Sequence, residues 1–596
     1  METKMMKVLR TGIAPLCALL LLGCETKTET VEIIVQAPPP APPVSTPVVV
    51  NVAASQVDGS FLLAGGAFAD SIYQSGDLFF YDQNAQVTVE LGNSYDHSYD
   101  TMLVNSTYDS IYELFTGGDV PANTWGVVAT DNAVNADATI NIDVPSATVR
   151  AQFLLNGAAF PASVYNHGTF YLQPVGSGEL IVLGESHIVN DIVNVIPGDY
   201  HVIYSHVQGD QVPANSYARV MSDVAVSGAA ALNIDVTSVD VRTAFTYNGA
   251  AFPQSQYVHA EFHLVNGADD DVFLGNSFDG PGSISVVAGI YDVEYRHQQG
   301  DTIPLNSGTT VSVNLDLTSG GVASADVAGV VLGITPTLNG QPFEVSEYQD
   351  GILELHDVIN DSYSLLGNTH SPMSGLVVIP GTYDIAYSHE TGDAVPQNVR
   401  GNVAAGYVIA GDQQLNLDIT AHSMTGSITI DTAAFPQSQY NTADFLVRGD
   451  TTDGDIHLFA SHSQDEAAML LPGTYDVIYS CHNCIDIPFN SYATIIDDFQ
   501  VNASGVIATN LSSVRVETSA TLNGSPFPQS IYQSGLIWGG TDPQDLVELT
   551  RTNVATADVI LLAGDYRFYY QHQNGEQVPA NTWALVDQQT VSAPPN

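Results

Sequence analysis

Hydrophobic residues in this chain recur with the two-residue period of β-strands, and no stretch beyond residue 30 combines a helical period with capping residues. In the segment 200–206, Tyr200, Val202 and Tyr204 occupy alternate positions, as expected of a strand with one buried face. Turn-favouring Pro-Gly, Asn-Gly and Gly-Asp pairs separate similar segments at 148–155, 169–174, 179–184, 191–196 and 217–226. The pattern predicts an all-β chain.

This strand pattern repeats at an almost constant interval. A Phe followed five positions later by a Tyr recurs every 91 or 92 residues, and each copy also carries a Val-Pro or Ile-Pro element with an asparagine two positions after the proline. Six copies with so little variation in length predict six modules, each with its own core. The Phe and Tyr pairs are Phe68/Tyr73, Phe160/Tyr165, Phe252/Tyr257, Phe343/Tyr348, Phe435/Tyr440 and Phe527/Tyr532.

A short strand-like segment between copies sets the predicted module boundaries. It occurs at 141–144, 233–236 and 416–419, has a counterpart at 48–52, and has none after the last copy. We therefore expect it to open each module, and, because linkers are nearly absent, we expect an extended rod. The expected modules are 48–139, 140–231, 232–322, 323–414, 415–506 and 507–596, preceded by a signal peptide (1–23) and a Thr/Pro-rich tether (24–47).

About seven short strands in each module predict a seven-stranded Greek-key β-sandwich of the Ig-like or transthyretin-like kind. The segment Pro-Gly-Asp-Tyr-His-Val-Ile-Tyr at 197–204 resembles the corresponding strand of transthyretin-like and carboxypeptidase-regulatory-like bacterial modules. The resemblance covers only this short segment of each module. It implies a sandwich used as a spacer or a binding module, and it carries over no functional residue.

The N-terminus has the features of an export signal. Lys4, Lys7 and Arg10 precede an apolar stretch at 13–22 that is too short to span a bilayer comfortably. The following Leu-Leu-Gly-Cys sequence, ending at Cys24, resembles the bacterial lipobox. The resemblance implies that Cys24 is lipidated, that the lipid anchors the chain to a membrane, and that the protein resides in the cell envelope, at the outer membrane or the cell surface.

The charge balance limits the partners that the chain can bind. There are 65 Asp and Glu residues against 13 Lys and Arg residues, a formal net charge of −52, and no lysine follows Lys27. Such a surface repels phosphate groups, so nucleic acid is excluded as a partner. The same surface attracts divalent cations. The absence of lysine also sets aside pilin-type modules that are locked by a Lys–Asn isopeptide bond.

Cysteines and clustered carboxylates supply the candidate site residues. Cys481 and Cys484 lie on one hairpin, where we expect a local disulfide in an oxidising compartment. Two acidic clusters at predicted hairpin turns are weak candidates for calcium ligands, although neither matches the EF-hand register, and a plain acidic turn is the alternative. These clusters are Asp269, Asp270 and Asp271, and Asp450, Asp453 and Asp455.

Residues that recur in every module are expected to serve the fold. The asparagine after the proline can bond nearby backbone and fix a turn, and Phe160 and Tyr165 with their equivalents are expected in the cores. Each module also has an acidic residue after its hairpin. Trp125 and Trp583 are candidates for stacking on sugars, with burial or capping of the array as the alternative.

No catalytic motif occurs, and six similar copies argue against an enzyme. The sequence predicts a non-catalytic structural or adhesive lipoprotein. The alternative is a ligand-binding array on the cell surface, with glycan or calcium as the ligand. No cofactor other than calcium is expected. A glycan or a protein on another surface is then the expected partner besides the membrane.

Overall fold

The computed structural model describes residues 45–188, 191–267, 270–450, 452–542 and 544–592. The lipobox with Cys24, most of the tether, and Asp269 lie outside the described residues. No helix among the described residues has the length and apolar character needed to cross a bilayer.

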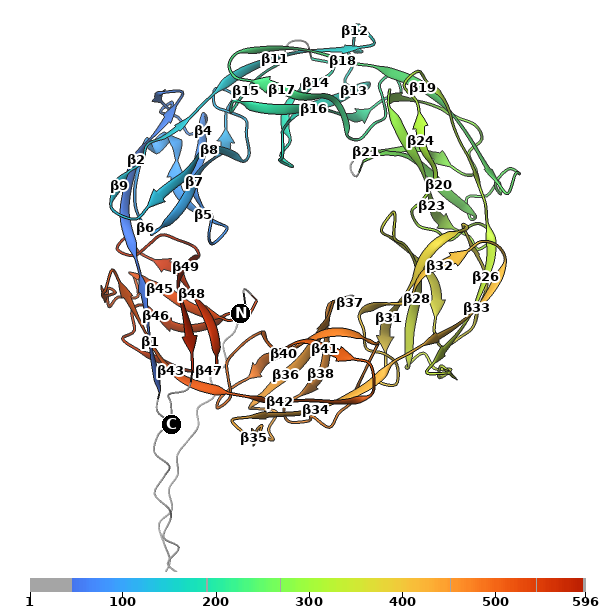
Figure 1. Ribbon diagram of the computed structural model, residues 1–596. Helices are drawn as coiled ribbons and strands as arrows, with labels where there is room; N and C mark the ends of the chain where they lie inside the picture. The colour runs from blue at the N-terminus through green and yellow to red at the C-terminus, as the bar shows by residue number, and fades with distance from the viewer. Residues whose placement is uncertain (1–44, 189–190, 268–269, 451, 543, 593–596) are drawn as a thin grey trace, which may run out of the picture. The chain divides into compact units, whose positions relative to one another are not determined.

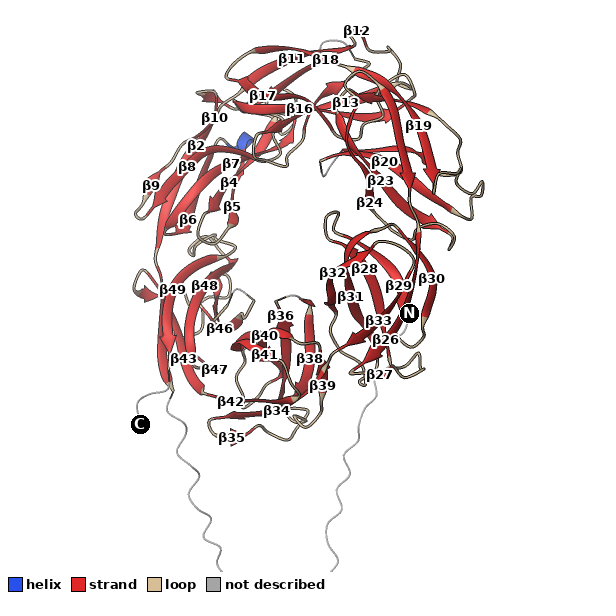
Figure 2. Cartoon of the chain, turned by 45° about the vertical axis from the view of Figure 1, so that its right-hand side comes forward, coloured by secondary structure: helices blue, strands red, loops and turns tan. Residues whose placement is uncertain are grey.

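The described chain consists of strands and loops, with one 3-10 turn, η1 (Ser94–Asp96), as Figure 2 shows. The strands form six sandwiches, each made of two sheets around its own hydrophobic cluster. The prediction of tandem β-sandwich modules is therefore confirmed.

The second sandwich illustrates the arrangement. One sheet has the order β15–β11–β18 and the other has the order β14–β13–β16–β17. Their strands are β11 (Ala147–Leu155), β12 (Ala158–Ala159), β13 (His167–Pro174), β14 (Ile181–Glu185), β15 (Asp191–Val195), β16 (Gly198–Gln208), β17 (Ala218–Val226) and β18 (Ala230–Val236). Phe153 stacks on Phe170 with ring centroids 4.1 Å apart, and Phe160 and Tyr204 pack against the same ring. Alternation along β16 therefore delivers its aromatic residues to the core, as predicted.

The other sandwiches repeat this plan. The first contains β2 (Ala54–Leu63), β3 (Gly66–Ala67), β4 (Ser75–Asp82), β5 (Val87–Asn93), β6 (Ser98–Val104), β7 (Ser106–Thr116), β8 (Gly126–Val134), β9 (Ala138–Thr139) and β10 (Ile142–Val144). The third contains β19 (Ser238–Tyr247), β20 (His259–Asn266), β21 (Asp270–Asn276), β22 (Ser283–Val287), β23 (Ile290–Gln299), β24 (Thr309–Asp316) and β25 (Gly321–Val327).

The fourth contains β26 (Val330–Leu338), β27 (Gln341–Pro342), β28 (Asp350–Asp357), β29 (Ser362–Asn368), β30 (Met373–Val378), β31 (Gly381–Thr391), β32 (Arg400–Ile409) and β33 (Gln413–Ile419). The fifth contains β34 (His422–Ile430), β35 (Ala433–Ala434), β36 (Thr442–Gly449), β38 (Asp455–Ala460), β39 (Ala468–Leu470), β40 (Gly473–Asn483), β41 (Ala493–Val501) and β42 (Gly505–Leu511), and lends β37 (Thr452–Asp453) to the edge of the fourth. The sixth contains β43 (Ser513–Leu522), β44 (Ser525–Pro526), β45 (Ser534–Gly540), β46 (Val547–Arg551), β47 (Ala557–Leu562), β48 (Gly564–Asn574) and β49 (Ala584–Val591).

The strand at each predicted boundary belongs to the preceding sandwich. β18 pairs in parallel with β11, and β10 pairs in parallel with β2. Ile234 and Val236 of β18 are buried in the second core. The expectation that this strand opens the following module is therefore wrong. The alternating pattern of this strand is compatible with the edge of either neighbouring sandwich, so the sequence did not decide between them. In the structure the strand pairs in parallel with the first strand of the preceding sandwich.

The counterpart at 48–52 completes the last sandwich. This strand, β1 (Thr46–Val52), pairs in parallel with β43, from Thr46 opposite Val516 to Val52 opposite Leu522, and lies beside it in Figure 1. Val48, Val50 and Val52 join the sixth core. Because β1 continues directly into β2, the last sandwich contacts the first and the modules form a closed circuit. The predicted extended rod is therefore wrong.

Candidate functional site

Each junction between sandwiches is held by the recurrent asparagine. Asn490 of the fifth sandwich accepts a hydrogen bond from the Leu562 N–H at 2.8 Å and donates one to the Tyr566 hydroxyl at 2.9 Å. Tyr566 in turn donates to the Leu562 carbonyl oxygen at 2.8 Å. The asparagine therefore bonds the next module, and the expectation that its side chain fixes a local turn is wrong.

The same bond from a backbone N–H to the asparagine Oδ1 occurs at all six junctions, including the one between the last and the first sandwich. All six asparagines are at most 2% exposed. A buried amide that satisfies groups of the neighbouring sandwich fixes the geometry of the junction, since leaving those groups unpaired is costly. The pairs of asparagine and N–H are Asn123/Ile196, Asn215/Val287, Asn306/Ile379, Asn398/Leu471, Asn490/Leu562 and Asn581/Val104.

The junction tyrosines predict how the array responds to alkali. Burial raises the pKa of Tyr291 and of Tyr383 to about 12, although hydrogen bonds from Asn215 and Asn306 lower it in part. In the unfolded chain these phenols ionise near pH 10. Their neutral form therefore stabilises the fold fully below about pH 10, and this contribution is lost as the pH rises through about 12.

We expect phenolate absorbance to rise in two stages, the later one accompanied by loss of the β-sheet circular dichroism signal. A single stage near the ordinary pKa, with the fold intact, would contradict this prediction.

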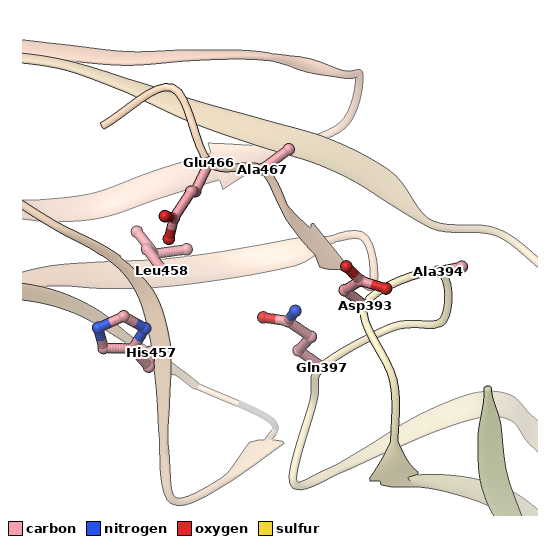
Figure 3. Close-up of a pocket in the computed structure, with 7 residues that line it drawn as sticks. All are labelled: Asp393, Ala394, Gln397, His457, Leu458, Glu466 and Ala467. Atoms are coloured by element: carbon pink, nitrogen blue, oxygen red, sulfur yellow. The ribbon is translucent and has the colours of Figure 1, made fainter. Parts of the chain in front are cut away.

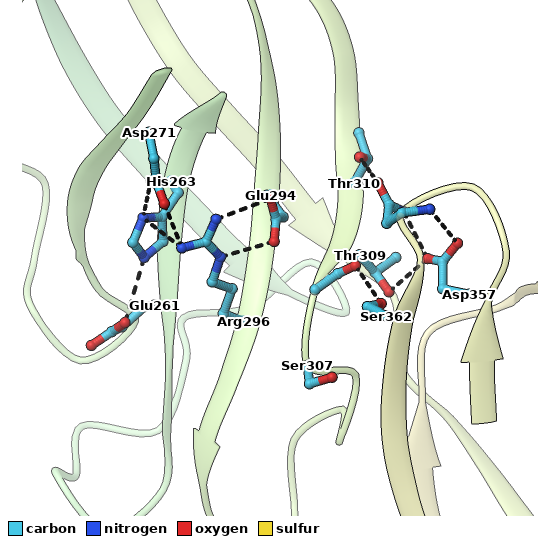
Figure 4. A network of polar contacts seen from close by, with 12 residues as sticks. Glu261, His263, Asp271, Glu294, Arg296, Ser307, Thr309, Thr310, Asp357 and Ser362 are labelled. Carbon is cyan, nitrogen blue, oxygen red and sulfur yellow. Dashed lines mark hydrogen bonds and ion pairs between the residues drawn. The ribbon is translucent and has the colours of Figure 1, made fainter. Parts of the chain in front are cut away.

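The acidic cluster at the start of β21 serves structure. Asp270 is buried, accepts hydrogen bonds from Asn215 Nδ2 at 2.8 Å and from the Tyr217 N–H at 3.1 Å, and so belongs to a junction. Burial raises the pKa of Asp270, although these hydrogen bonds lower it in part. Asp271 instead bonds Arg296 at 2.7 Å and His263 at 2.5 Å (Figure 4). Burial alone would raise the pKa of Asp271, but these two partners hold it below its ordinary value.

The residues of the second acidic cluster lie in different surroundings. Asp455 accepts hydrogen bonds from Arg448 Nε at 2.9 Å and from the Tyr492 hydroxyl at 2.7 Å. Asp453 lies on β37, opposite Arg400 of the fourth sandwich, and Asp450 is exposed. Of the carboxylates considered for calcium, Asp270, Asp271 and Asp455 thus accept hydrogen bonds from donors of the protein itself.

Cys481 and Cys484 form the disulfide that the sequence predicts. The bridge spans the end of β40 and the loop after it. This hairpin packs beside β36, where Cys484 Sγ lies 3.9 Å from the Thr442 carbonyl oxygen. The disulfide therefore stabilises one hairpin of the fifth sandwich.

The largest departure from expectation concerns the six tyrosines of the Phe and Tyr pairs. Every Phe of the pairs is buried, but the tyrosines are 67–76% exposed, so their predicted place in the cores is wrong. In each copy the Tyr N–H donates to the hydroxyl of a Ser two residues earlier at 3.2 Å. We call each segment from the Phe to the Tyr a tyrosine turn. The serine fixes its backbone and leaves the ring in solvent.

Each tyrosine turn packs against the loop that carries the module's recurrent acidic residue, which we call the acidic loop. In the fourth sandwich, Gln349 follows Tyr348, and its Oε1 accepts a hydrogen bond from the Ala394 N–H at 2.7 Å. Gly392 has a φ of +95°, and a Cβ there would lie 2.5 Å from the Tyr348 carbonyl oxygen, so glycine allows the close approach. The loop carboxylates, which are all exposed, are Asp119, Asp210, Asp301, Asp393, Asp486 and Glu576.

A polar pocket of about 630 Å³ adjoins the acidic loop of the fourth sandwich (Figure 3). Asp393 and Gln397 line it from the fourth sandwich, and His457 and Glu466 line it from the fifth. His457 Nε2 lies 3.6 Å from an oxygen of Asp444. The pocket therefore offers scattered hydrogen-bonding groups at a junction.

The two tryptophans considered for sugar stacking are partly covered by other rings. Trp583 stacks on Tyr569 with centroids 5.1 Å apart and also lies near Trp538. Trp125 remains partly exposed and contacts the Tyr81 ring edge-on at 6.2 Å. The tyrosine turns, which sequence reasoning placed in the cores, are thus the more open aromatic surface.

No family model matches the chain, and no curated protein matches it. Solved structures are similar over part of its length. The Bacillus anthracis TIE protein is 10% identical, covers 59% of this chain and 69% of its own, and has a TM-score of 0.13. Two B repeat units of the collagen binding protein of Staphylococcus aureus are 12% identical, cover 62% of this chain and 98% of their own, and have a TM-score of 0.12.

The pilus adhesin SpaC of Lactobacillus rhamnosus GG is 12% identical, covers 74% of this chain and 56% of its own, and has a TM-score of 0.11. The chain described here is a repeat protein of tandem β-sandwiches with buried asparagine junctions.

Proposed function

We propose that this protein is a non-catalytic cell-envelope lipoprotein that uses its six tyrosine turns to bind a repeated ligand on another surface. The favoured ligand is a glycan. The observation that carries the proposal is the exposure of the same tyrosine in all six sandwiches.

Folding gives no reason to keep this residue. The serine and the buried Phe define the turn, while the tyrosine ring stands in solvent and contributes little to a core. A large exposed aromatic side chain is an ordinary occurrence once. Its recurrence at one position in six diverged modules indicates a function at that position.

The chemistry of the turn suits a sugar. A tyrosine ring offers a flat apolar face for the C–H face of a pyranose and a hydroxyl for hydrogen bonds. The exposed carboxylate of the neighbouring acidic loop accepts hydrogen bonds from sugar hydroxyls, and the pocket beside Asp393 adds further polar groups. An anionic polymer would be repelled by the net charge of −52.

Repetition compensates for the weakness of each contact. A single exposed ring with one carboxylate binds weakly, but six such sites on one chain add through effective concentration. The buried junctions support this effect because they fix neighbouring sandwiches relative to each other. A lipid on Cys24, followed by the Pro-rich tether, would hold the array off a membrane.

Replacing all six tyrosines by alanine is expected to reduce binding on a glycan array to background while leaving the melting temperature nearly unchanged, since exposed side chains contribute little to stability. A matched control replaces six exposed apolar residues elsewhere, namely Val49, Phe115, Val182, Val313, Leu365 and Val408. Glycan binding that survives in the six-tyrosine variant would overturn the proposal.

Repeating the measurements with calcium and with a chelator tests the alternative that the array binds calcium, which the recurrent exposed carboxylates favour. If calcium raises the melting temperature and a chelator abolishes glycan binding, the acidic loops act through the ion. If neither has an effect, the tyrosine turns act alone.

A further inference from the structure

A compact group of metal-ligating side chains lies at the base of the tyrosine turn of the second sandwich. His167 begins β13 two residues after Tyr165, Glu185 ends the neighbouring strand β14, and His187 follows in the next turn. Glu185 Oε2 lies 3.3 Å from His187 Nδ1 and 4.0 Å from His167 Nε2. In the part of the chain that the structure describes, this is the one group of three or more His, Cys, Asp or Glu residues found to have ligand atoms all within 4.8 Å of one another.

The two imidazoles have buried nitrogens without hydrogen-bond partners. His167 is 6% exposed, and its Nδ1 is buried and unpaired. Nδ1 of His187, the atom nearest the carboxylate, also lacks a hydrogen bond. The two rings meet edge to face with centroids 4.8 Å apart. An unpaired buried polar atom destabilises a fold, so a ligand on His187 Nδ1 would relieve part of this cost, while the His167 atom that faces Glu185 is Nε2.

We propose that His167, Glu185 and His187 bind one divalent transition-metal ion of the zinc class. Zinc takes imidazole nitrogen and carboxylate oxygen at about 2.0–2.2 Å in tetrahedral sites, which separates neighbouring ligand atoms by roughly 3.4 Å. The observed separations approach that value, so small side-chain rotations complete the set. Two imidazoles disfavour calcium and magnesium, which prefer oxygen. Three protein ligands leave a fourth position for water or a bound ligand.

The equivalent positions of the fifth sandwich supply a control for this group. In the fifth, the hydrogen bond from the Ala443 N–H to Ser461 Oγ corresponds to that from the Gly168 N–H to Ser186 Oγ, both 3.0 Å long. This match places Thr442, Ala460 and His462 at the three ligand positions. The fifth sandwich therefore keeps one histidine, His462, but lacks the other two ligands. For this reason His462 provides a matched control.

The test is a zinc titration of the metal-free full chain by calorimetry in excess magnesium, because the acidic surface attracts divalent cations weakly everywhere. We expect one tight equivalent of zinc. His187→Ala and Glu185→Gln should each weaken zinc binding by more than about 100-fold, since each removes a direct ligand. His462→Ala should leave the affinity unchanged.

Cobalt substitution gives a readout that does not depend on the variants. Cobalt(II) bound by two imidazoles, a carboxylate and water should give the strong visible absorption of a tetrahedral site. Equal affinity in the wild type and His187→Ala would overturn the proposal. So would zinc binding that magnesium displaces fully, or a cobalt spectrum of the hydrated ion.

Discussion

Val50→Asp is expected to unfold the sixth sandwich and to release the contact between the two ends of the described chain. Val50 is 0% exposed, lies in β1 opposite Ala520, and belongs to the sixth core. Burying a valine contributes about 1.5–3 kcal/mol, and an unpaired buried carboxylate costs several kcal/mol more. Because a whole domain is stable by about 5–15 kcal/mol, β1 should leave the sheet.

The matched control is Val49→Asp on the same strand. Val49 is 53% exposed because successive side chains of a strand point to opposite faces. In a denaturant titration, the Val50 variant should show an additional early transition, and limited proteolysis should cut within 513–591. The Val49 variant should unfold like the wild type. If the two variants unfold alike, then β1 does not complete the sixth sandwich.

The closed circuit could not be predicted from the sequence, for a physical reason. Alternating hydrophobicity predicted the strands, and a constant interval predicted six sandwiches. The segment 48–52, however, carries the same alternation as 141–144, and either could occupy an edge on either side. Parallel pairing between Val48 and Thr518 joins positions at opposite ends of the array, and local patterns hold no information about such a partner.

Recurrence in every module identified the important residues but did not predict their contacts. A residue present in every copy can serve the core, a junction or a surface. Phe160 was correctly placed in the core, but Tyr165, five residues later on the same turn, faces solvent. Asn215 was assigned to a turn and instead bonds the next module. Each of these three residues recurs in all six modules, so recurrence alone does not distinguish a core residue from a surface or junction residue.

The candidate metal site illustrates the opposite limit. His167 and His187 are separated by a hairpin, and only the pairing of β13 with β14, which sets Thr169 opposite Glu185, brings the group together. A position-by-position alignment of the six modules contains a partial signal, since histidine recurs at the position of His187 in His370 and His462. The alignment thus identifies the position of His187 as one where histidine recurs. Only the register of β13 against β14 shows that His167 and Glu185 lie beside it.

Asn581→Ala is expected to loosen the junction between the last and the first sandwich. Asn581 accepts a hydrogen bond from the Val104 N–H at 2.8 Å and donates one to the Tyr108 hydroxyl at 2.9 Å. Alanine leaves the buried N–H unpaired, while Tyr108 keeps its bond to the Val104 carbonyl oxygen at 2.6 Å. An unpaired buried donor costs about 1–3 kcal/mol, and 1.4 kcal/mol corresponds to a factor of ten in an equilibrium.

Hydrogen exchange at the Val104 amide measures this loss directly. A cost of about 2 kcal/mol predicts exchange that is roughly thirtyfold faster. Thr582→Ala, which removes only the exposed hydrogen bond to the Thr88 carbonyl oxygen, should leave the rate unchanged. Asn398→Ala should accelerate exchange at Leu471 and leave Val104 protected. If Val104 stays protected in Asn581→Ala, the asparagine does not hold this junction closed.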